Sequence, residues 1–235
     1  NKIERISLYT GFSVFWAKLK NHLLSAITNN KPLAERLRPQ SLDEVVGQKH
    51  LLGEDGVFRK LVDSGSLPSM IFWGPPGVGK TTLAHILAKY YDLPFITLSA
   101  INAGVKDVRQ VIEIARKQGK VLLFIDEIHR FNKSQQDSLL GAVEDGSIVL
   151  IGATTENPSF EVISALLSRS QVFTLKHLER KDLEELIDRA FEKDDWIKEQ
   201  KVEILEREAL LRLSGGDARR LLNLLEIIAA NAAGQ

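Results

Sequence analysis

The eight residues GPPGVGKT, from Gly74 to Thr81, restrict this chain to few folds. They fit the pattern G-x-x-x-x-G-K-[ST], with the apolar run Met70–Trp73 before them and a stretch of helical period, residues 81–91, after them. In such a unit the glycines let successive backbone N–H groups point at phosphate oxygens, and the N-terminus of the helix adds its dipole. The motif therefore predicts a strand, a phosphate-binding loop and a helix in an α/β protein.

Short apolar runs alternate with helix-period stretches from Lys31 to Leu175. This repeated succession predicts a parallel sheet with helices on both faces. We expect strands at Met70–Trp73, Phe95–Leu98, Val121–Ile125, Ile148–Ala153 and Val172–Leu175, and helices at 81–91, 105–118, 134–143 and 161–168. Beyond Leu175 the apolar stripes predict only helices, at about 180–193, 202–214 and 217–232. The chain is therefore expected to form an α/β domain over 31–175 and a small all-helical domain over 176–235.

Residues 1–30 form a separate block, with four bases against one acid. Their apolar side chains recur every three or four residues from Leu8 to Ile27, which predicts an amphipathic helix. Such a basic helix can serve in targeting, at a membrane surface or in docking to a partner, but packing on its own domain or on a neighbouring copy is commoner. No membrane span is expected, because the uncharged stretch Ile6–Ala17 is about half of the roughly 20 residues required.

The composition excludes several kinds of site. The 235 residues include no cysteine, which excludes a disulfide framework, a thiolate nucleophile and a zinc site built from cysteines. The 31 basic and 31 acidic residues give a formal net charge of zero, so the average charge gives no support for nucleic-acid binding. Any phosphate-binding face must therefore be local.

The loop and the start of its helix are expected to bind the phosphates of a nucleotide. Lys80 would bring its charge to the β- and γ-phosphates, and the Thr81 hydroxyl would ligate Mg²⁺, which needs only one or two protein oxygens. The full predicted set is Gly74, Pro75, Pro76, Gly77, Val78, Gly79, Lys80, Thr81 and Thr82.

A second motif lies where the apolar run Val121–Ile125 leads directly into Asp126 and Glu127. An apolar run without alternation is typical of a central parallel strand, whose carboxyl end faces the crevice where open α/β sheets bind ligands. Asp126 is expected to hold the hydration shell of Mg²⁺, and Glu127 to orient or deprotonate the water that attacks the γ-phosphate. The two motifs together are typical of P-loop ATPases, with ATP and Mg²⁺ as cofactors.

The residues around these motifs resemble AAA+ ATPases, near the clamp-loader subunits. Besides the two motifs, the resemblance rests on Ser168-Arg169 and on Gly-Asp-Ala-Arg at 216–219. Three further segments are similar to the family of replication-associated recombination protein A and Werner helicase-interacting protein: PLAERLRP at 32–39, DEIHRFNKSQQD at 126–137 and GATTENPSF at 152–160. The resemblance covers about 31–235.

This resemblance implies an AAA+ module with a five-stranded sheet, followed by a three-helix lid. It implies that Thr154 senses the γ-phosphate, because in such folds its strand lies between the strands that carry the two motifs; Thr155 is the alternative. It also implies that Arg169 reaches the ATP site of an adjacent subunit and that Arg219 contacts the γ-phosphate within its own chain.

The same resemblance assigns the segment 36–48 to the adenine, through Arg38, Val46 and Gly47. His129 and Arg130 follow the carboxylates closely enough to couple DNA or a neighbouring subunit to Glu127. The implied partners are single-stranded or forked DNA, other replication proteins such as single-strand binding protein, and further copies of the protein that assemble through domains beyond the lid. The implied location is the cytoplasm, near the nucleoid.

The function that follows is a DNA-dependent ATPase at stalled or damaged replication forks, whose hydrolysis remodels an oligomer and its DNA. A clamp-loader subunit or a Holliday-junction branch-migration ATPase would share the site, although the run from Ile128 to Asp137 disfavours both. A nucleotide-binding switch or scaffold without hydrolysis is a third hypothesis, which the presence of Glu127, Arg169 and Arg219 disfavours.

Overall fold

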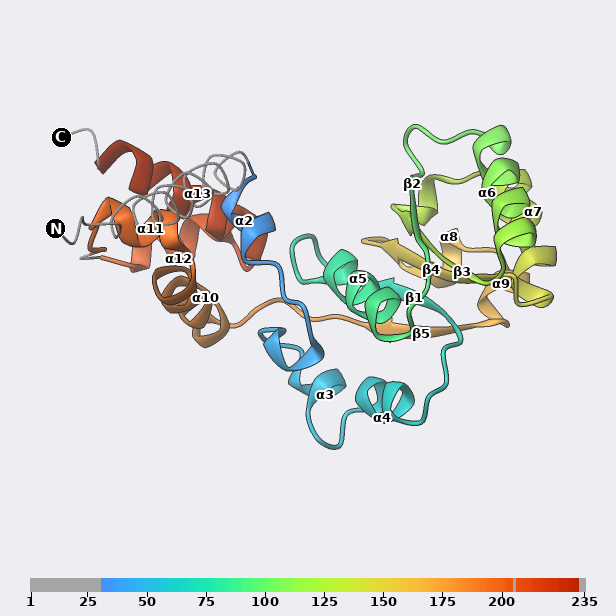
Figure 1. Cartoon of the computed structure of the whole chain (residues 1–235), viewed down its shortest axis with the longest axis horizontal. Coiled ribbons are helices and arrows are strands. Elements are labelled where there is room, and N and C mark those ends of the chain that lie inside the picture. The colour runs from blue at the N-terminus through green and yellow to red at the C-terminus, as the bar shows by residue number, and fades with distance from the viewer. Residues whose placement is uncertain (1–30, 205, 233–235) are drawn as a thin grey trace, which may run out of the picture.

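The structure is a computed structural model that describes residues 31–204 and 206–232 (Figure 1). The helix predicted within residues 1–30 lies outside the described residues. The strands are β1 (Ser69–Trp73), β2 (Phe95–Ser99), β3 (Val121–Asp126), β4 (Ile148–Thr154) and β5 (Ser170–Thr174). The helices are α2 (Leu33–Arg36), α3 (Lys49–Leu52), α4 (Val57–Asp63), α5 (Lys80–Tyr90), α6 (Val105–Gln118), α7 (Lys133–Glu144), α8 (Pro158–Glu161), α9 (Ser164–Leu167), α10 (Arg180–Lys193), α11 (Asp195–Gln200), α12 (Glu208–Ser214) and α13 (Ala218–Ala232), with 3-10 turns η1 (Leu42–Glu44) and η2 (Ile128–Arg130).

The five strands form one parallel sheet in the order β2-β3-β4-β1-β5, which confirms the predicted fold class. Each strand lies within two residues of its predicted bounds. β1 pairs with β4 up to Trp73 opposite Thr154, and with β5 on its other side. The carboxyl ends of β3, β4 and β1 therefore lie side by side at one edge of the sheet, where ligands bind in open α/β sheets.

Helices cover both faces of the sheet because successive strand residues point to opposite faces. Met70 and Phe72 of β1 pack in one core with Leu83 of α5, whereas Ile71 packs in a second core with Val108 of α6 and residues of α7. Figure 1 accordingly shows α5 on one side of the sheet and α6 and α7 on the other.

The helices after β5 form a third core. It is built from α10, α11, α12 and α13, with Ile187, Leu210 and Leu225 among its buried side chains. Leu33 of α2 is fully buried in the same core, and Figure 1 shows α2 beside α13. The segment just before residue 40 thus packs with the helices near the C-terminus, while the proposed division at residue 175 remains a prediction.

The predicted helix 161–168 was wrong, because α8 and α9 are separate short helices. Val162 and Ile163 between them have extended backbone. The N–H of Ile163 donates to Oε1 of Gln136 on α7 at 2.9 Å, instead of to a carbonyl of its own helix. A tertiary contact therefore interrupts a segment whose periodicity alone is helical.

The predicted helix 202–214 was also wrong in its first half, because α12 begins at Glu208. The sequence pattern did not predict α11, which begins where the Asp194 side chain accepts a hydrogen bond from the N–H of Ile197 at 3.0 Å. It also did not predict the short helices α2, α3 and α4. Among the described residues, none of the helices has the length and apolar character needed to cross a membrane.

Candidate nucleotide-binding site

The loop between β1 and α5 folds as a cradle. Gly77 and Gly79 have φ angles of +69° and +105°, which residues with a side chain rarely adopt. A Cβ atom on Gly77 would also lie 1.9 Å from Oδ1 of Asp217, so the approach of these segments requires glycine. Because α5 begins at Lys80, directly after Gly79, its unpaired N–H groups and positive dipole end belong to the loop. This is the anion-binding geometry that the sequence predicts.

Lys80 is folded back onto the loop. The residue is 8% exposed, and its Nζ donates to the carbonyl oxygens of Gly74 at 2.6 Å and of Pro75 at 2.8 Å. Burial lowers the pKa of Lys80, and the nearby carboxylates of Glu127 and Asp126 oppose that shift only in part. Phosphate oxygens would give this ammonium charged partners in place of neutral carbonyls.

One cavity joins the loop, the end of β3 and the helical core. Its polar end is lined by Pro76, Gly77, Val78, Gly79, Lys80, Thr81, Thr82, Asp126 and Glu127. Its apolar end is lined by Ala34, Leu37, Pro39, Val45, Val46, Leu178, Leu186 and Leu222, and Arg38, Ala218 and Arg219 complete the wall. An apolar surface next to an anion cradle matches the two ends of a nucleotide, base and phosphates.

Three of the predicted binding residues are not on this wall. Gly74 and Pro75 do not line the cavity, and their carbonyl oxygens accept hydrogen bonds from Lys80. Gly47 lies beside Leu178, and a Cβ atom there would come within 2.7 Å of Leu178 Cδ2. Gly47 therefore brings its segment close to the start of α10, and Val46 next to it reaches the cavity.

Most residues of the apolar wall were not predicted from the sequence. Its residues come from α2 and the residues just after it, from the two residues that follow η1, from α10 and the segment before it, and from α13. These segments are far apart along the chain. Their only signal in the sequence is the apolar stripe of each helix, which indicates core packing equally well. Recognising this wall requires the folded arrangement.

The two carboxylates follow β3 in a constrained turn. Asp126 is the last residue of the strand, and Glu127 has a φ of +55°, in the left-handed region that is uncommon for a residue with a side chain. Oε2 of Glu127 lies 3.3 Å from Nε2 of His129. Backbone strain of this kind concentrates at functional sites, because the surrounding structure must hold it in place.

Thr81 and Asp126 supply the oxygen types that Mg²⁺ prefers, a hydroxyl and a carboxylate, and both line the cavity. Within residues 31–204 and 206–232 no cluster of three or more His, Cys, Asp or Glu side chains could hold a metal alone. Mg²⁺ at nucleotide sites keeps most of its water and uses one or two protein oxygens beside the phosphates. These two residues therefore fit the ion.

Thr154 ends β4, which lies between β3 and β1 as the resemblance implies. The residue is fully buried, and its Oγ1 lies 3.0 Å from Nδ1 of His129. It also accepts a hydrogen bond from the N–H of Glu156 at 3.0 Å. Neither Thr154 nor Thr155 lines the cavity, so Thr154 contacts the site through His129.

The two predicted arginines lie in different places. Arg219 is the second residue of α13 and lines the cavity, where the neighbouring N–H of Ala218 donates to the carbonyl oxygen of Gly77 at 3.1 Å. Arg169 lies outside the cavity, beyond the end of α9, and its side chain is 40% exposed. Its guanidinium pairs with Oε1 of Glu144 at 2.6 Å.

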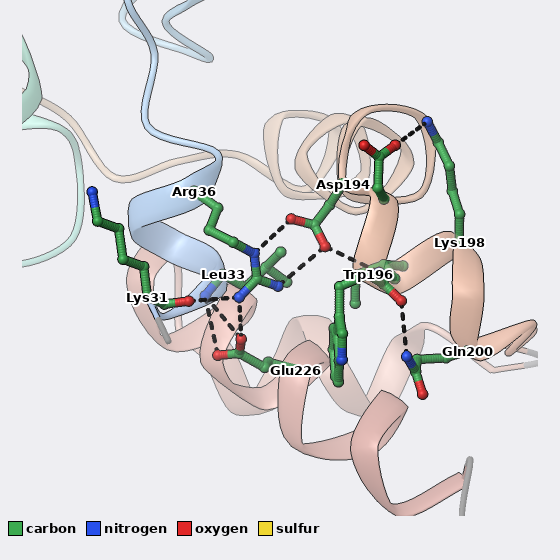
Figure 2. A network of polar contacts seen from close by, with 10 residues as sticks. Lys31, Leu33, Arg36, Asp194, Trp196, Lys198, Gln200 and Glu226 are labelled. Carbon is green, nitrogen blue, oxygen red and sulfur yellow. Dashed lines mark hydrogen bonds and ion pairs between the residues drawn. The ribbon is translucent and has the colours of Figure 1, made fainter. Parts of the chain in front are cut away.

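A polar network joins α2 to the helices of the third core, as Figure 2 shows. Arg36 donates through Nε and Nη2 to the two carboxylate oxygens of Asp194, at 2.7 and 3.1 Å, and through Nη1 to Glu226 at 2.8 Å. The N–H of Leu33 also donates to the Glu226 carboxylate at 3.1 Å. Because the cavity residues from Ala34 to Pro39 flank Arg36, these contacts join the wall to α11 and α13.

Replacing Arg36 with methionine is expected to lower the free energy of unfolding by about 3 kcal/mol, because the change leaves a buried carboxylate without its cation. Burial alone would lower the pKa of Arg36, but hydrogen bonds with Asp194 and Glu226 outweigh it and raise the pKa. The side chains of Arg36 and Asp194 are only 10% and 6% exposed. Urea unfolding of the variant measures the loss.

Arg180→Met is the matched control for that measurement. Arg180 also contacts two carboxylates, Glu184 and Glu208, but its side chain is 63% exposed. Exposed ion pairs contribute little to stability, so the urea midpoint should stay close to the original one. Equal shifts for the two variants would contradict the assignment of Arg36 as the buried anchor.

Comparison with known proteins agrees with this geometry. Residues 70–178 match the family described as AAA, the ATPase family associated with various cellular activities. Replication-associated recombination protein A of Escherichia coli K12 is 48% identical over 206 residues, which cover 85% of this chain and 46% of that protein. ATPase WRNIP1 of Dictyostelium discoideum is 47% identical over 221 residues, or 89% of this chain and 25% of that protein. The chain thus spans less than half the length of these curated relatives.

Solved structures show the same fold. The RuvB Holliday junction branch migration motor of Thermotoga maritima matches with a TM-score of 0.65 and 31% identity, over 81% of this chain and 64% of that one. The parallel sheet and its helices agree with this match. Residues 70–178 form an AAA domain, and over most of its length the chain is similar to replication-associated recombination protein A and ATPase WRNIP1.

Proposed function

We propose that this chain is the ATP-hydrolysing part of a DNA-dependent ATPase that acts at stalled or damaged replication forks. The proposal rests mainly on the meeting of the phosphate loop with Asp126, Glu127 and Arg219 in one cavity. Binding a nucleotide requires the loop alone, whereas hydrolysis also requires a carboxylate placed near the γ-phosphate. The relatives named for replication-associated recombination support the setting of a replication fork.

Each residue of the cavity has a role in this reaction. The N–H groups of the loop and Lys80 bind the phosphates, and Thr81 and Asp126 hold the ion. Bound Mg²⁺ would neutralise the charge that develops on the phosphate oxygens. Glu127 orients the attacking water and accepts its proton, and the apolar wall with Val46 and Arg38 receives the base.

The two predicted arginines, Arg219 and Arg169, contact ATP in different chains. Arg219 contacts the γ-phosphate from the start of α13, so that loss of this phosphate loosens the helices from the loop. Arg169 acts on the ATP of a neighbouring subunit, which its exposed position outside its own cavity supports. A guanidinium supplied in this way makes hydrolysis depend on assembly, because it stabilises charge in the transition state.

The partners belong to the proposal as well. Residues 31–175 carry no net charge and residues 176–235 carry 11 bases against 14 acids, so DNA contacts must come from a local group of bases. We take the DNA to be single-stranded or forked, and the site of action to be the nucleoid within the cytoplasm. The other proposed partners are further copies of the protein and replication proteins such as single-strand binding protein.

ATP turnover of the 235-residue chain with Mg²⁺ tests this function when forked DNA is compared with blunt duplex DNA. Forked DNA should raise turnover several-fold, and the stimulation should fall steeply as salt rises, because phosphate contacts release counterions. The Glu127→Gln variant supplies the background rate. Equal stimulation of ATP turnover by both DNA forms, or stimulation that does not change with salt concentration, would contradict the proposal.

A branch-migration ATPase is the second candidate, because the matched RuvB structure is described as such a motor. The chain is 31% identical to RuvB and 48% identical to replication-associated recombination protein A, and this difference favours a function at replication forks over branch migration. Stimulation by a four-way junction above that by a fork would reverse this order. Tight ATP binding without turnover in any DNA would favour the third hypothesis, a nucleotide-binding switch.

A further inference from the structure

His129 lies between the carboxylate of one strand end and the hydroxyl of the next. Its Nε2 is 3.3 Å from Oε2 of Glu127, and its Nδ1 is 3.0 Å from Oγ1 of Thr154. The ring belongs to η2, directly after β3, while Thr154 ends β4. The His129 and Glu127 side chains are 13% and 27% exposed, and His129 does not line the cavity. The ring therefore joins two residues of the site without facing the nucleotide.

The proton of the Thr154 hydroxyl has two available acceptors. A hydroxyl has one proton and two acceptor positions, and the N–H of Glu156 occupies one of these at 3.0 Å. The proton can go to the carbonyl oxygen of Glu156 at 3.2 Å or to Nδ1 of His129 at 3.0 Å. The two choices have opposite consequences for the ring.

When the hydroxyl donates to Nδ1, a neutral ring carries its proton on Nε2 and can donate to Glu127. When the hydroxyl donates to Glu156, Nδ1 must donate to Thr154, and a neutral ring then turns a lone pair toward the carboxylate. Only the first arrangement attracts the Glu127 carboxylate. The 3.3 Å approach is slightly longer than an ordinary N–H···O hydrogen bond, as is common before substrate binds.

We propose that His129 is a positioning residue for Glu127, and that Thr154 acts by fixing which ring nitrogen carries the proton. This inference rests on the proposed function, because it takes Glu127 as the base. Thr154 then acts on Glu127 through the ring and needs no contact with the nucleotide, in agreement with its complete burial.

The ring-nitrogen chemical shifts of His129 test the arrangement without any catalysis. The chain has five histidines, so the signals can be assigned by comparison with the His129→Gln variant. We expect a neutral ring with its proton on Nε2 and a hydrogen-bonded Nδ1. Thr154→Val should remove the Nδ1 hydrogen bond and leave the other four histidines unchanged. A ring protonated on Nδ1, or on both nitrogens, would overturn the proposal.

Kinetics separate positioning from a merely structural role. His129→Phe should lower kcat about 10- to 100-fold with less than about a threefold change in ATP affinity, because the base is displaced while the phosphate cradle stays intact. His129→Gln, which puts an amide near the place of Nε2, should recover part of kcat, whereas His129→Asn should not. The double variant with Thr154→Val should be no slower than His129→Phe alone.

Lys117→Gln is the control, because Lys117 is exposed on α6 and does not line the cavity. It should leave the rate without DNA within about twofold, as for a surface change away from the site. Unchanged kcat in His129→Phe, or additive losses in the double variant, would overturn the proposal. If the chain has no turnover above that of Glu127→Gln, the proposed function fails, and the nitrogen shifts still decide the placement of the proton.

Discussion

Glu127→Gln is expected to lower kcat for ATP by about 100- to 10,000-fold, the range that a positioned general base contributes. The amide keeps the size of the side chain but cannot accept the proton of the attacking water. Affinity for ATP should change little, because the loop and Lys80 bind the phosphates and the apolar wall binds the base. Steady-state turnover together with equilibrium binding of ATP measures the two effects separately.

Glu113→Gln gives the matched control, since Glu113 is exposed on α6 outside the cavity. It should turn over ATP at the original rate. A comparable loss in both variants would show that charge alone, and not the place of Glu127 after β3, sets the rate. A loss of ATP affinity in Glu127→Gln as large as its loss of kcat would assign Glu127 to binding.

Lys80→Met is expected to weaken ATP binding by about 100-fold or more, because two charge-assisted contacts to phosphate are lost. The same change should leave the urea midpoint of the nucleotide-free chain unchanged or higher. Burial lowers the pKa of Lys80, so its charged form costs free energy in the folded state below that pKa. The methionine removes this cost and fills similar space.

The lowered pKa of Lys80 also predicts how the stability of the nucleotide-free chain changes with pH. A folded-state pKa below the unfolded one means that the nucleotide-free chain gains stability as pH rises through the folded pKa, and Lys80→Met should remove that gain. Lys89→Met, at the exposed far end of α5, is the control and should bind ATP normally. A Lys80→Met chain that binds ATP normally would contradict the assignment of the loop.

The sequence predicted well where one local pattern decides the structure. The apolar runs Val121–Ile125 and Ile148–Ala153 are buried on both faces, so they form strands in any packing, and the loop and its carboxylates follow at their ends. The parallel strands β3 and β1, with β4 between them, then bring Lys80, Asp126 and Glu127 to the same edge of the sheet.

Prediction failed where the local structure depends on a contact with a residue that is distant in the sequence. The interruption at Ile163 depends on Gln136, and α11 depends on Asp194, whose carboxylate also binds Arg36. The apolar wall combines side chains of α2, α10 and α13, and no single segment carries its pattern. The link from Thr154 through His129 likewise depends on the turn at Glu127, whose left-handed backbone no local motif predicts.

The strand order also has a consequence for the order in which the chain can fold. β1 pairs with β4 on one side and with β5 on the other, and Ile151, which lies opposite Met70, is synthesised 81 residues later. A nascent chain that has just exposed the phosphate loop therefore lacks both neighbours of the strand that supports it. Long-range parallel pairing of this kind is slow, because loop closure precedes any stabilising contact. Nucleotide binding should consequently begin only after β5 and α10 have left the ribosome, and ATP would then stabilise a domain that is already complete.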